Sequence, residues 1–298
     1  MKLFLLKLIS LLLLITLSTG LMKFLLPSKK TYNSAFIDKL ELVKKNKNQR
    51  KILLIGGSSI GWGVSAEQIE KATNITTINL GHHAGFGLVD FQDFLLSCLT
   101  PDDLIIFCPE WFYYNNPNAY DTATLNNLLQ NSAYLDLTNK PLATRLRSIF
   151  LKKISFSEDK DKSSPYVYKC INQNGDIISH CGLKPEGPKK YSVDFDSLDL
   201  KTFTNTFKYI STVRCILLFP PTQESVYLKD KKSFEKLQAV ISQSKLTFID
   251  SIKSNIYHES DFFDQNYHLK CDVITERTKK VIQYISKNII LPKNVLPN

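Results

Sequence analysis

Short apolar runs alternate with segments of helical periodicity along most of the chain. The apolar runs predict buried strands, and the periodic segments between them predict helices. We expect strands at 51–55, 75–80, 102–108, 213–219 and 246–250, and helices at 65–73, 88–99, 198–211, 230–244 and 272–286. Because strands that alternate with helices form parallel sheets covered on both faces, the chain is predicted to be a three-layer α/β/α sandwich.

An apolar segment opens the chain. Residues 11–22 contain no charged side chain and are flanked by Lys2 and Lys7 on one side and by Lys23 on the other. With the apolar residues before it, this segment reaches the roughly 20 residues that span a bilayer. Residues 18–20 lack the small-residue pattern of a signal-peptide cleavage site. We therefore expect residues 1–30 to be an uncleaved signal anchor and the remaining chain to lie on the extracytoplasmic side of the membrane.

The rest of the chain divides by composition. Residues 31–50 are rich in Lys and Asn and are predicted to be a tether with a short helix. Residues 51–298 are predicted to form one domain, in which the strand–helix alternation is lost at about 115–197. We interpret 115–197 as an insertion, which could supply specificity because binding residues often lie on loops of a rigid α/β frame.

Cysteine spacing favours one disulfide. Cys170 and Cys181 flank Asn174-Gly175, the dipeptide preferred in a type I′ hairpin turn. A disulfide between these two cysteines is expected if the domain is extracytoplasmic. Cys271 opens the last predicted helix without an evident partner, and the other cysteines lie in apolar runs, where they are expected to be core residues: Cys98, Cys108 and Cys215.

Charge and spacing argue against several classes of function. The net charge is +10, but lysine carries most of it, and the scarce arginines do not suggest a nucleic-acid-binding module. No pair of cysteines has the C-x-x-C spacing of a zinc or redox site. His82 and His83 have no acid or cysteine at ligand spacing. We expect neither a metal nor a cofactor.

The glycine-rich stretch GGSSIGWG, residues 56–63, follows the first predicted strand. A phosphate loop would need Lys-Ser/Thr after its glycines, and this stretch has none. Residues 61–66 match G-x-G-x-x-A, so a nucleotide-binding α/β protein remains an alternative, although the second strand ends in Asn79 where a ribose-binding acid is expected. The third interpretation is a serine nucleophile, Ser59, exposed on a tight turn after the strand.

A serine nucleophile needs a base to take its proton. Asp264 and His268 lie in DFFDQNYHLK, just before the last predicted helix. An acid beside a histidine can fix the imidazole tautomer and stabilise the imidazolium. The sequence therefore predicts Ser59, His268 and Asp264 as a catalytic group.

Three stretches in this order resemble a known family. They are Gly57-Ser58-Ser59, the segment Asn79-Leu-Gly-His-His-Ala-Gly85, and the late acid–histidine stretch. Together they resemble the SGNH (GDSL) hydrolase superfamily, and within it the membrane-anchored envelope branch that includes the D-alanyl transfer protein and proteins of polysaccharide O-acetylation. The resemblance covers most of 51–110 and 245–290 and implies an SGNH, flavodoxin-like fold.

The resemblance also implies roles for individual residues. Ser59 would be the nucleophile, His268 the base and Asp264 its orienting acid. The oxyanion hole would be formed by the N–H of Ser59 and that of Gly81 or Gly85.

The chain departs from the family pattern in two places. The family usually offers an Asn side chain as a further oxyanion donor, whereas this chain has Glu110 followed by Trp111, whose indole N–H could donate instead. Trp111 and Tyr113 are expected either to pack in the core or to bind substrate as an aromatic sugar platform. The acid precedes the histidine by four positions where the family usually has three, and Asp261 is a second, weaker candidate for the acid.

These features predict a membrane-anchored serine esterase or O-acyltransferase, with acetyl as the expected acyl group. Its expected partners are a cell-envelope polysaccharide, an acyl donor and a membrane acyltransferase, and no nucleic acid. The alternative is a catalytically degenerate SGNH domain that binds polysaccharide or scaffolds a membrane acyltransferase. The unusual residues after the third predicted strand favour that alternative.

Overall fold

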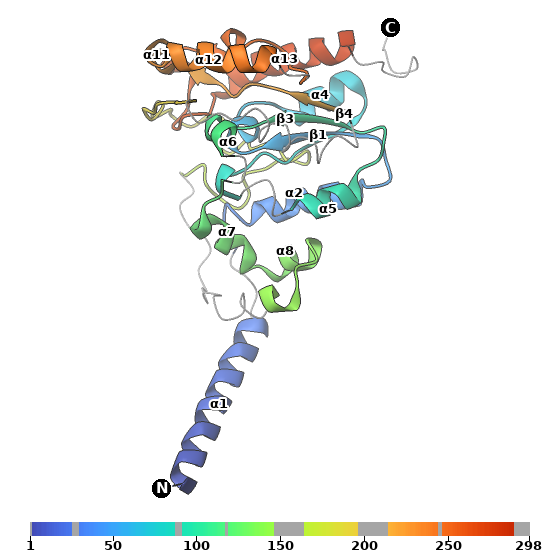
Figure 1. Cartoon of the computed structure of the whole chain (residues 1–298). Helices are drawn as coiled ribbons and strands as arrows, with labels where there is room; N and C mark the ends of the chain where they lie inside the picture. The colour runs from blue at the N-terminus through green and yellow to red at the C-terminus, as the bar shows by residue number, and fades with distance from the viewer. Residues whose placement is uncertain are drawn as a thin grey trace.

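The structure, a computed structural model, describes residues 2–25, 30–86, 91–116, 119–145, 164–195, 214–243 and 246–288. Figure 1 shows a layered α/β body from which the N-terminal helix projects. The strands are β1 (Lys51–Gly56), β2 (Thr76–Asn79), β3 (Leu104–Cys108), β4 (Arg214–Leu217), β5 (Thr222–Gln223) and β6 (Ile256–Tyr257). The helices are α1 (Lys2–Leu25), α2 (Ala35–Lys45), α3 (Ser58–Gly61), α4 (Ala66–Thr73), α5 (Gln92–Cys98), α6 (Trp111–Asn115), α7 (Thr122–Leu129), α8 (Ser132–Leu137), α11 (Glu224–Lys229), α12 (Lys231–Ser242) and α13 (Cys271–Asn288).

A parallel sheet of four strands, in the order β2-β1-β3-β4, forms the centre of the molecule. In β1, Leu53 is opposite Ile78 on one side and Ile105 on the other. A parallel bridge between Leu217 and Phe248 extends the sheet beyond β4, where a fifth strand is predicted. The predicted parallel sheet is therefore confirmed. Strands β5 and β6 form a separate parallel pair.

Apolar side chains cover both faces of the sheet. On one face, Leu53 and Ile105 belong to a cluster that contains Phe36 and Leu40 of α2. On the other face, alternate strand residues pack with Ile69 of α4 and Val281 of α13. Figure 1 shows α2 and α5 on one side of the sheet and α4 and α13 on the opposite side. This arrangement is compatible with three layers.

The segment predicted to be a tether contributes to the core. Helix α2 buries Phe36, Leu40 and Val43 completely or almost completely. These residues recur at helical spacing, so one face of α2 is apolar and packs on the sheet while its lysines at the C-terminal end face solvent. The α/β domain thus includes helix α2, which lies within residues 31–50, the segment predicted to be a tether.

The N-terminal helix α1 is apolar around its circumference and exposes large side chains from Leu3 to Leu21. Across the part of the chain that the structure describes, no helix has both the length and the apolar character needed to cross a membrane.

Local signals set several element boundaries correctly. The helix predicted at 65–73 is α4, and Ser65 caps it, because the Ser65 hydroxyl accepts the backbone N–H of Gln68. The helix predicted at 230–244 is α12, and the terminal helix predicted at 272–286 is α13. The helix predicted at 198–211 lies outside the described residues.

The predicted disulfide is wrong. Cys181 is bonded to Cys271, at the start of α13, and Cys170 is a buried free thiol. The hairpin itself exists, since Ile171 and Ile177 form an antiparallel bridge, but its turn is not type I′. Only Gly175 has a positive φ, of 82°, whereas a type I′ turn requires positive φ at two residues.

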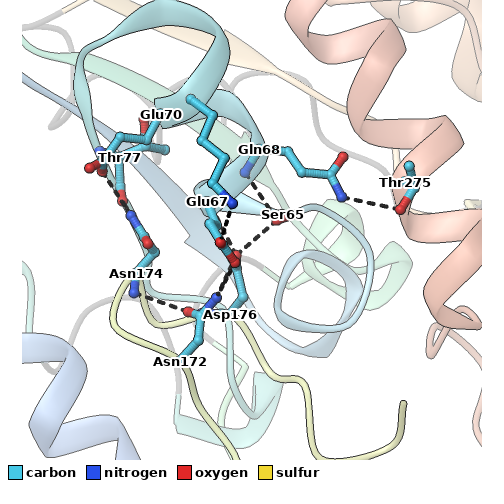
Figure 2. A network of polar contacts seen from close by, with 10 residues as sticks. Ser65, Glu67, Gln68, Glu70, Thr77, Asn172, Asn174, Asp176 and Thr275 are labelled. Carbon is cyan, nitrogen blue, oxygen red and sulfur yellow. Dashed lines mark hydrogen bonds and ion pairs between the residues drawn. The ribbon is translucent and has the colours of Figure 1, made fainter. Parts of the chain in front are cut away.

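The hairpin is fixed to the sheet domain by a polar network (Figure 2). Asp176 accepts the backbone N–H groups of Ala66 and Glu67 at the start of α4, at 2.7 and 3.0 Å. It also accepts the Ser65 hydroxyl and the Asn79 amide. Because this carboxylate satisfies donors at a helix N-terminus, it joins the insertion to the frame.

Candidate functional site

The glycine-rich turn connects β1 to the short helix α3, and a buried carboxylate holds it. The side chain of Glu110 accepts the N–H of Ser59 at 2.9 Å and that of Gly57 at 3.3 Å. A Cβ at position 57 would lie 2.4 Å from the Glu110 carboxylate and 2.6 Å from Cα of Ala84. Glycine is therefore required at position 57 so that the turn can approach both groups.

A second pair of glycines brings two loops together. A Cβ at Gly61 would lie 2.5 Å from the carbonyl oxygen of Gly81, and one at Gly81 would lie 2.3 Å from the nitrogen of Gly61. The close approach places the loop after β2, which carries His82 and His83, beside the turn after β1. These glycines allow the two backbones to pack against each other.

The two serines of the turn have different environments. Ser59 is fully buried, and its hydroxyl donates to the carbonyl oxygen of Cys108 at 2.9 Å. Ser58 is partly exposed and lines a cavity of about 440 Å³ together with His268. The structure does not bring Ser59 to the cavity that contains the predicted base; it brings Ser58 there.

An acid–histidine pair lies at this cavity. Nδ1 of His268 is 2.8 Å from a carboxylate oxygen of Asp264, and both side chains are nearly buried. The second carboxylate oxygen accepts the hydroxyl of Tyr166 at 2.5 Å. Because Nδ1 faces a carboxylate, Nδ1 carries the proton in the neutral ring and Nε2 has the free lone pair. Nε2 is thus the atom that can act as a base.

The charges of this pair are set by opposing effects. Burial lowers the pKa of His268 and outweighs Asp264, whose hydrogen bond and charge raise it, so the pKa lies below its usual value. Burial raises the pKa of Asp264, but hydrogen bonds from His268 and Tyr166 outweigh burial and hold that pKa below its usual value. Near neutral pH the pair is therefore a carboxylate and a neutral imidazole.

Aromatic packing fixes the histidine ring. The indole of Trp62 stacks on His268, with ring centroids 4.1 Å apart and an angle of 5° between the planes. Trp62 donates its indole N–H to the hydroxyl of Tyr32 at 3.0 Å, and Tyr32 in turn contacts Tyr166 edge to face. An imidazolium formed during a reaction would be stabilised against the indole face.

The predicted oxyanion donors are all engaged with protein atoms. The Ser59 N–H is bonded to Glu110, as described above. The Gly81 N–H donates to the side-chain oxygen of Asn79 at 2.9 Å, and the Gly85 N–H donates to Nδ1 of His83 at 2.9 Å. A substrate oxyanion would have to replace one of these acceptors.

The predicted aromatic platform is part of the core. Trp111 is buried and donates its indole N–H to the hydroxyl of Thr222 at 3.1 Å. Tyr113 is also buried, and its hydroxyl donates to the carbonyl oxygen of Ala84. Neither side chain lines the cavity of Ser58 and His268. The aromatic residues that do line it are tyrosines from three segments: Tyr32, Tyr166 and Tyr267.

Sequence reasoning missed several of the residues that form the site. Ser58 is the neighbour of the predicted nucleophile, Ser59. Which of the two serines reaches the cavity depends on how helix α3 is rotated relative to strand β1. Tyr32 lies in the predicted tether and Tyr166 in the predicted insertion, where no periodicity connects them to the domain. The Gly61-Trp62-Gly63 pattern was a usable signal, because a large side chain between two close-packed glycines can occupy few positions.

Two groups of side chains among the described residues come close enough to share a metal ion. One is His180 with Cys181 and Cys271, whose sulfurs are bonded to each other and are not thiolates. The other consists of Glu224, Glu259 and the exposed His258. Neither group lies among the residues of the Ser58 cavity.

Comparisons with known proteins give no further assignment. The chain matches no protein-family model, and searches of curated proteins and of solved structures also find no match.

Proposed function

We propose that the protein is a serine-dependent acyl-transfer enzyme of the SGNH type, an esterase or O-acyltransferase. Ser58 takes the acyl group in place of Ser59, His268 is the general base, and Asp264 orients the base. The observation that carries the proposal is that Ser58 and His268 line one cavity and that His268 is hydrogen-bonded to Asp264.

The chemistry follows from these positions. Nε2 of His268 takes the proton of the Ser58 hydroxyl as its oxygen attacks the carbonyl carbon of an ester. The imidazolium that results is stabilised by the Asp264 carboxylate and returns the proton to the leaving alcohol. The acyl group then passes from Ser58 to water or to another hydroxyl.

The test is turnover of p-nitrophenyl acetate by a fragment beginning at Lys30, with Ser58→Ala, Ser59→Ala and His268→Ala variants. Loss of turnover with Ser58→Ala and His268→Ala, and retention with Ser59→Ala, is the expected result. Turnover that depends on Ser59 and not on Ser58 would contradict the proposed nucleophile.

A second candidate function is a degenerate SGNH domain that binds polysaccharide or scaffolds a membrane acyltransferase. The engaged N–H groups of Ser59, Gly81 and Gly85 favour it, because hydrolysis is slow without oxyanion donors. Two results together would establish this function. The folded wild-type fragment would give no turnover, and a variant with both Ser58 and His268 replaced would still bind an envelope polysaccharide.

We also propose that the domain acts outside the cytoplasm and is held at the membrane by α1. The exposed leucines of α1 support this location, since a helix that is apolar all round needs an apolar environment. The bond between Cys181 and Cys271 also supports it, because disulfides persist in oxidising compartments. Release of the protein from membranes by a carbonate wash without detergent would contradict the anchor.

A further inference from the structure

The bond between Cys181 and Cys271 joins the insertion to the segment that carries the proposed base. Cys271 is the first residue of α13 and follows His268 closely in the chain. Cys181 is exposed, and Cys271 is partly exposed. Because exposed disulfides are the ones that exchange with external thiols, the bond is open to attack from the side of Cys181.

A histidine donor faces one of the two sulfurs. Nε2 of His180 lies 3.3 Å from Sγ of Cys271 and 3.1 Å from the carbonyl oxygen of Leu269. Since that carbonyl can only accept, Nε2 carries the hydrogen of the neutral ring. Burial lowers the pKa of His180 to about 4, so the ring is neutral near pH 7. If Cys271 becomes a thiolate, this N–H can donate a charge-assisted hydrogen bond to it.

The start of α13 also favours a thiolate at Cys271. This residue occupies the first position of an 18-residue helix, where the helix dipole stabilises negative charge and lowers the pKa of a thiol. Cys181 lies in a turn outside any helix. The two sulfurs therefore differ: Cys181 is the more accessible one, and Cys271 is the better leaving group, because a thiol of lower pKa leaves faster.

His180 connects the disulfide with the proposed base. Its ring packs against the indole of Trp62, with centroids 4.6 Å apart, and the indole stacks on His268. The insertion also supplies Tyr166, whose hydroxyl donates to Asp264. The disulfide is thus the covalent tie between the insertion and the loop whose acid and base it contacts.

We infer that the bond between Cys181 and Cys271 is a redox-active disulfide that exchanges with a dithiol, and that its reduction lowers the activity of the Ser58 site. The effect on activity rests on the proposed function, whereas the exchange reaction does not. The oxidised form holds the insertion against the acid–histidine pair, and the reduced form lacks that tie.

The exchange balances in two steps. A thiolate of the dithiol attacks Sγ of Cys181, a mixed disulfide forms, and Cys271 leaves as a thiolate that accepts the N–H of His180. The second thiolate of the dithiol then attacks the reductant's own sulfur in the mixed disulfide, and Cys181 leaves. Two electrons pass to the protein, both cysteine sulfurs gain the protons that the dithiol loses, and the reductant departs as an internal disulfide.

The first experiment locates the attacked sulfur. Native full-length protein in detergent is treated with glutathione, a monothiol whose first product is the mixed disulfide, and is quenched with N-ethylmaleimide. Tandem mass spectrometry is expected to find glutathione on Cys181 and N-ethylmaleimide on Cys271. Glutathione on Cys271 in equal or larger amount, or a bond that opens only after unfolding in urea, would overturn the inference.

The second experiment tests the histidine donor. His180→Phe keeps an aromatic ring beside Trp62 but removes the N–H, and the rate constant for reduction by dithiothreitol is expected to fall about fivefold. His258→Gln, at an exposed histidine bonded to Ser260, is the control and should reduce at the wild-type rate. An equal rate constant in His180→Phe and the wild-type protein would overturn the inference. The adduct mapping needs no substitution, so it remains decisive if His180→Phe does not fold.

The third experiment measures p-nitrophenyl acetate turnover by the oxidised, reduced and reoxidised protein. Dithiothreitol is removed before the assay, because thiols attack the ester. Reduction is expected to lower turnover at least about tenfold, since a small displacement of a catalytic group is costly, and reoxidation should restore it. The control is Cys215→Ser, which removes a partly buried free thiol and should respond as the wild-type protein does. Equal turnover in the oxidised and reduced proteins would overturn the inference.

A resonance of the base distinguishes failure of the inference from failure of the proposed function. The ring proton signals of His268 are recorded in the oxidised and reduced proteins, and reduction is expected to shift them. If neither form turns over ester but reduction shifts the signals, the proposed function fails alone. If the bond is open and the signals do not shift, the inference fails.

Discussion

Two aspartates that lie outside the strands of the α/β domain, Asp176 and Asp264, have different roles. Asp176 is bonded to backbone N–H groups at the start of α4 and to the side chains around them (Figure 2). Asp264 is bonded to the ring of His268 and to the hydroxyl of Tyr166, both at the cavity. A carboxylate that satisfies backbone donors fixes architecture, whereas one that orients an imidazole leaves the second ring nitrogen available for chemistry.

The largest expected effect is on the chemistry. Ser58→Ala should lower ester turnover at least about 10³-fold, because Ser58 is the proposed nucleophile and lines the same cavity as His268. The free energy of unfolding of Ser58→Ala in urea should change little, since the Ser58 side chain is partly exposed.

Ser59→Ala should keep turnover but lower stability. It removes a buried hydrogen bond to Cys108 and should cost about 1–2 kcal/mol of stability. Equal losses of turnover in Ser58→Ala and Ser59→Ala would contradict the assignment of Ser58 as the nucleophile and Ser59 as a structural residue.

The disulfide should give the largest effect on stability. It connects positions 90 residues apart, so the double variant Cys181→Ser and Cys271→Ser should lose about 4.5 kcal/mol by the chain-entropy argument. Urea unfolding of the wild-type protein with and without dithiothreitol should show the same loss. Dithiothreitol should not change the double variant, which is the control. A wild-type transition that dithiothreitol does not move would contradict the pairing.

Asp176→Ala should cost about 3 kcal/mol, because it leaves the first N–H groups of α4 and the amide of Asn79 without their acceptor. Asp102→Ala, which removes an exposed carboxylate before β3, is the matched control and should have almost no effect. If Asp176→Ala lowers stability but its folded fraction has normal activity, Asp176 has a structural role, unlike Asp264. Loss of activity without loss of stability would contradict the structural role of Asp176.

The smallest expected effect concerns pH. Turnover requires neutral His268, whose pKa lies below its usual value, so the rate should fall only in acid, as His268 gains a proton. The Tyr166 hydroxyl stabilises the Asp264 carboxylate. In Tyr166→Phe the Asp264 carboxylate loses this hydrogen bond and interacts more strongly with the imidazolium form of His268. The pKa of His268 therefore rises, and the acid limb of the rate profile should move to higher pH.

Tyr168→Phe is the control for this pH effect. The Tyr168 hydroxyl donates to Asp38, away from the cavity, so its loss should leave the rate profile in place. A shift of the acid limb to lower pH in Tyr166→Phe would show that the tyrosine acts on His268 by another route.

Much of the frame was predictable from sequence because β1 and β3 are continuous apolar runs and α4 has a serine cap. The site was predictable only in part. The acid and the histidine are four residues apart on one loop, so local sequence brings Asp264 and His268 together. Ser58 and Ser59 differ by about 100° of helical rotation, and the direction each faces depends on how the turn leaves β1.

Contacts between distant segments were not predictable. Tyr32 and Tyr166 reach the cavity from segments without periodicity, and their positions depend on tertiary packing. Cys181 pairs with Cys271 because the insertion folds back onto the start of α13, whereas spacing alone favoured the nearer Cys170. The failures share one physical cause: sequence patterns report local structure, and these pairs are determined by which loops meet at the sheet edge.

The proposed function requires Ser58, and not Ser59, to be the reactive serine. The most direct measurement is to treat the folded fragment with a fluorophosphonate, digest it and locate the modified serine by tandem mass spectrometry, with His268→Ala as the control. We expect an adduct on Ser58 that is lost or greatly reduced in His268→Ala. An adduct on Ser59, or no adduct on either serine in a folded and otherwise unmodified protein, would contradict it.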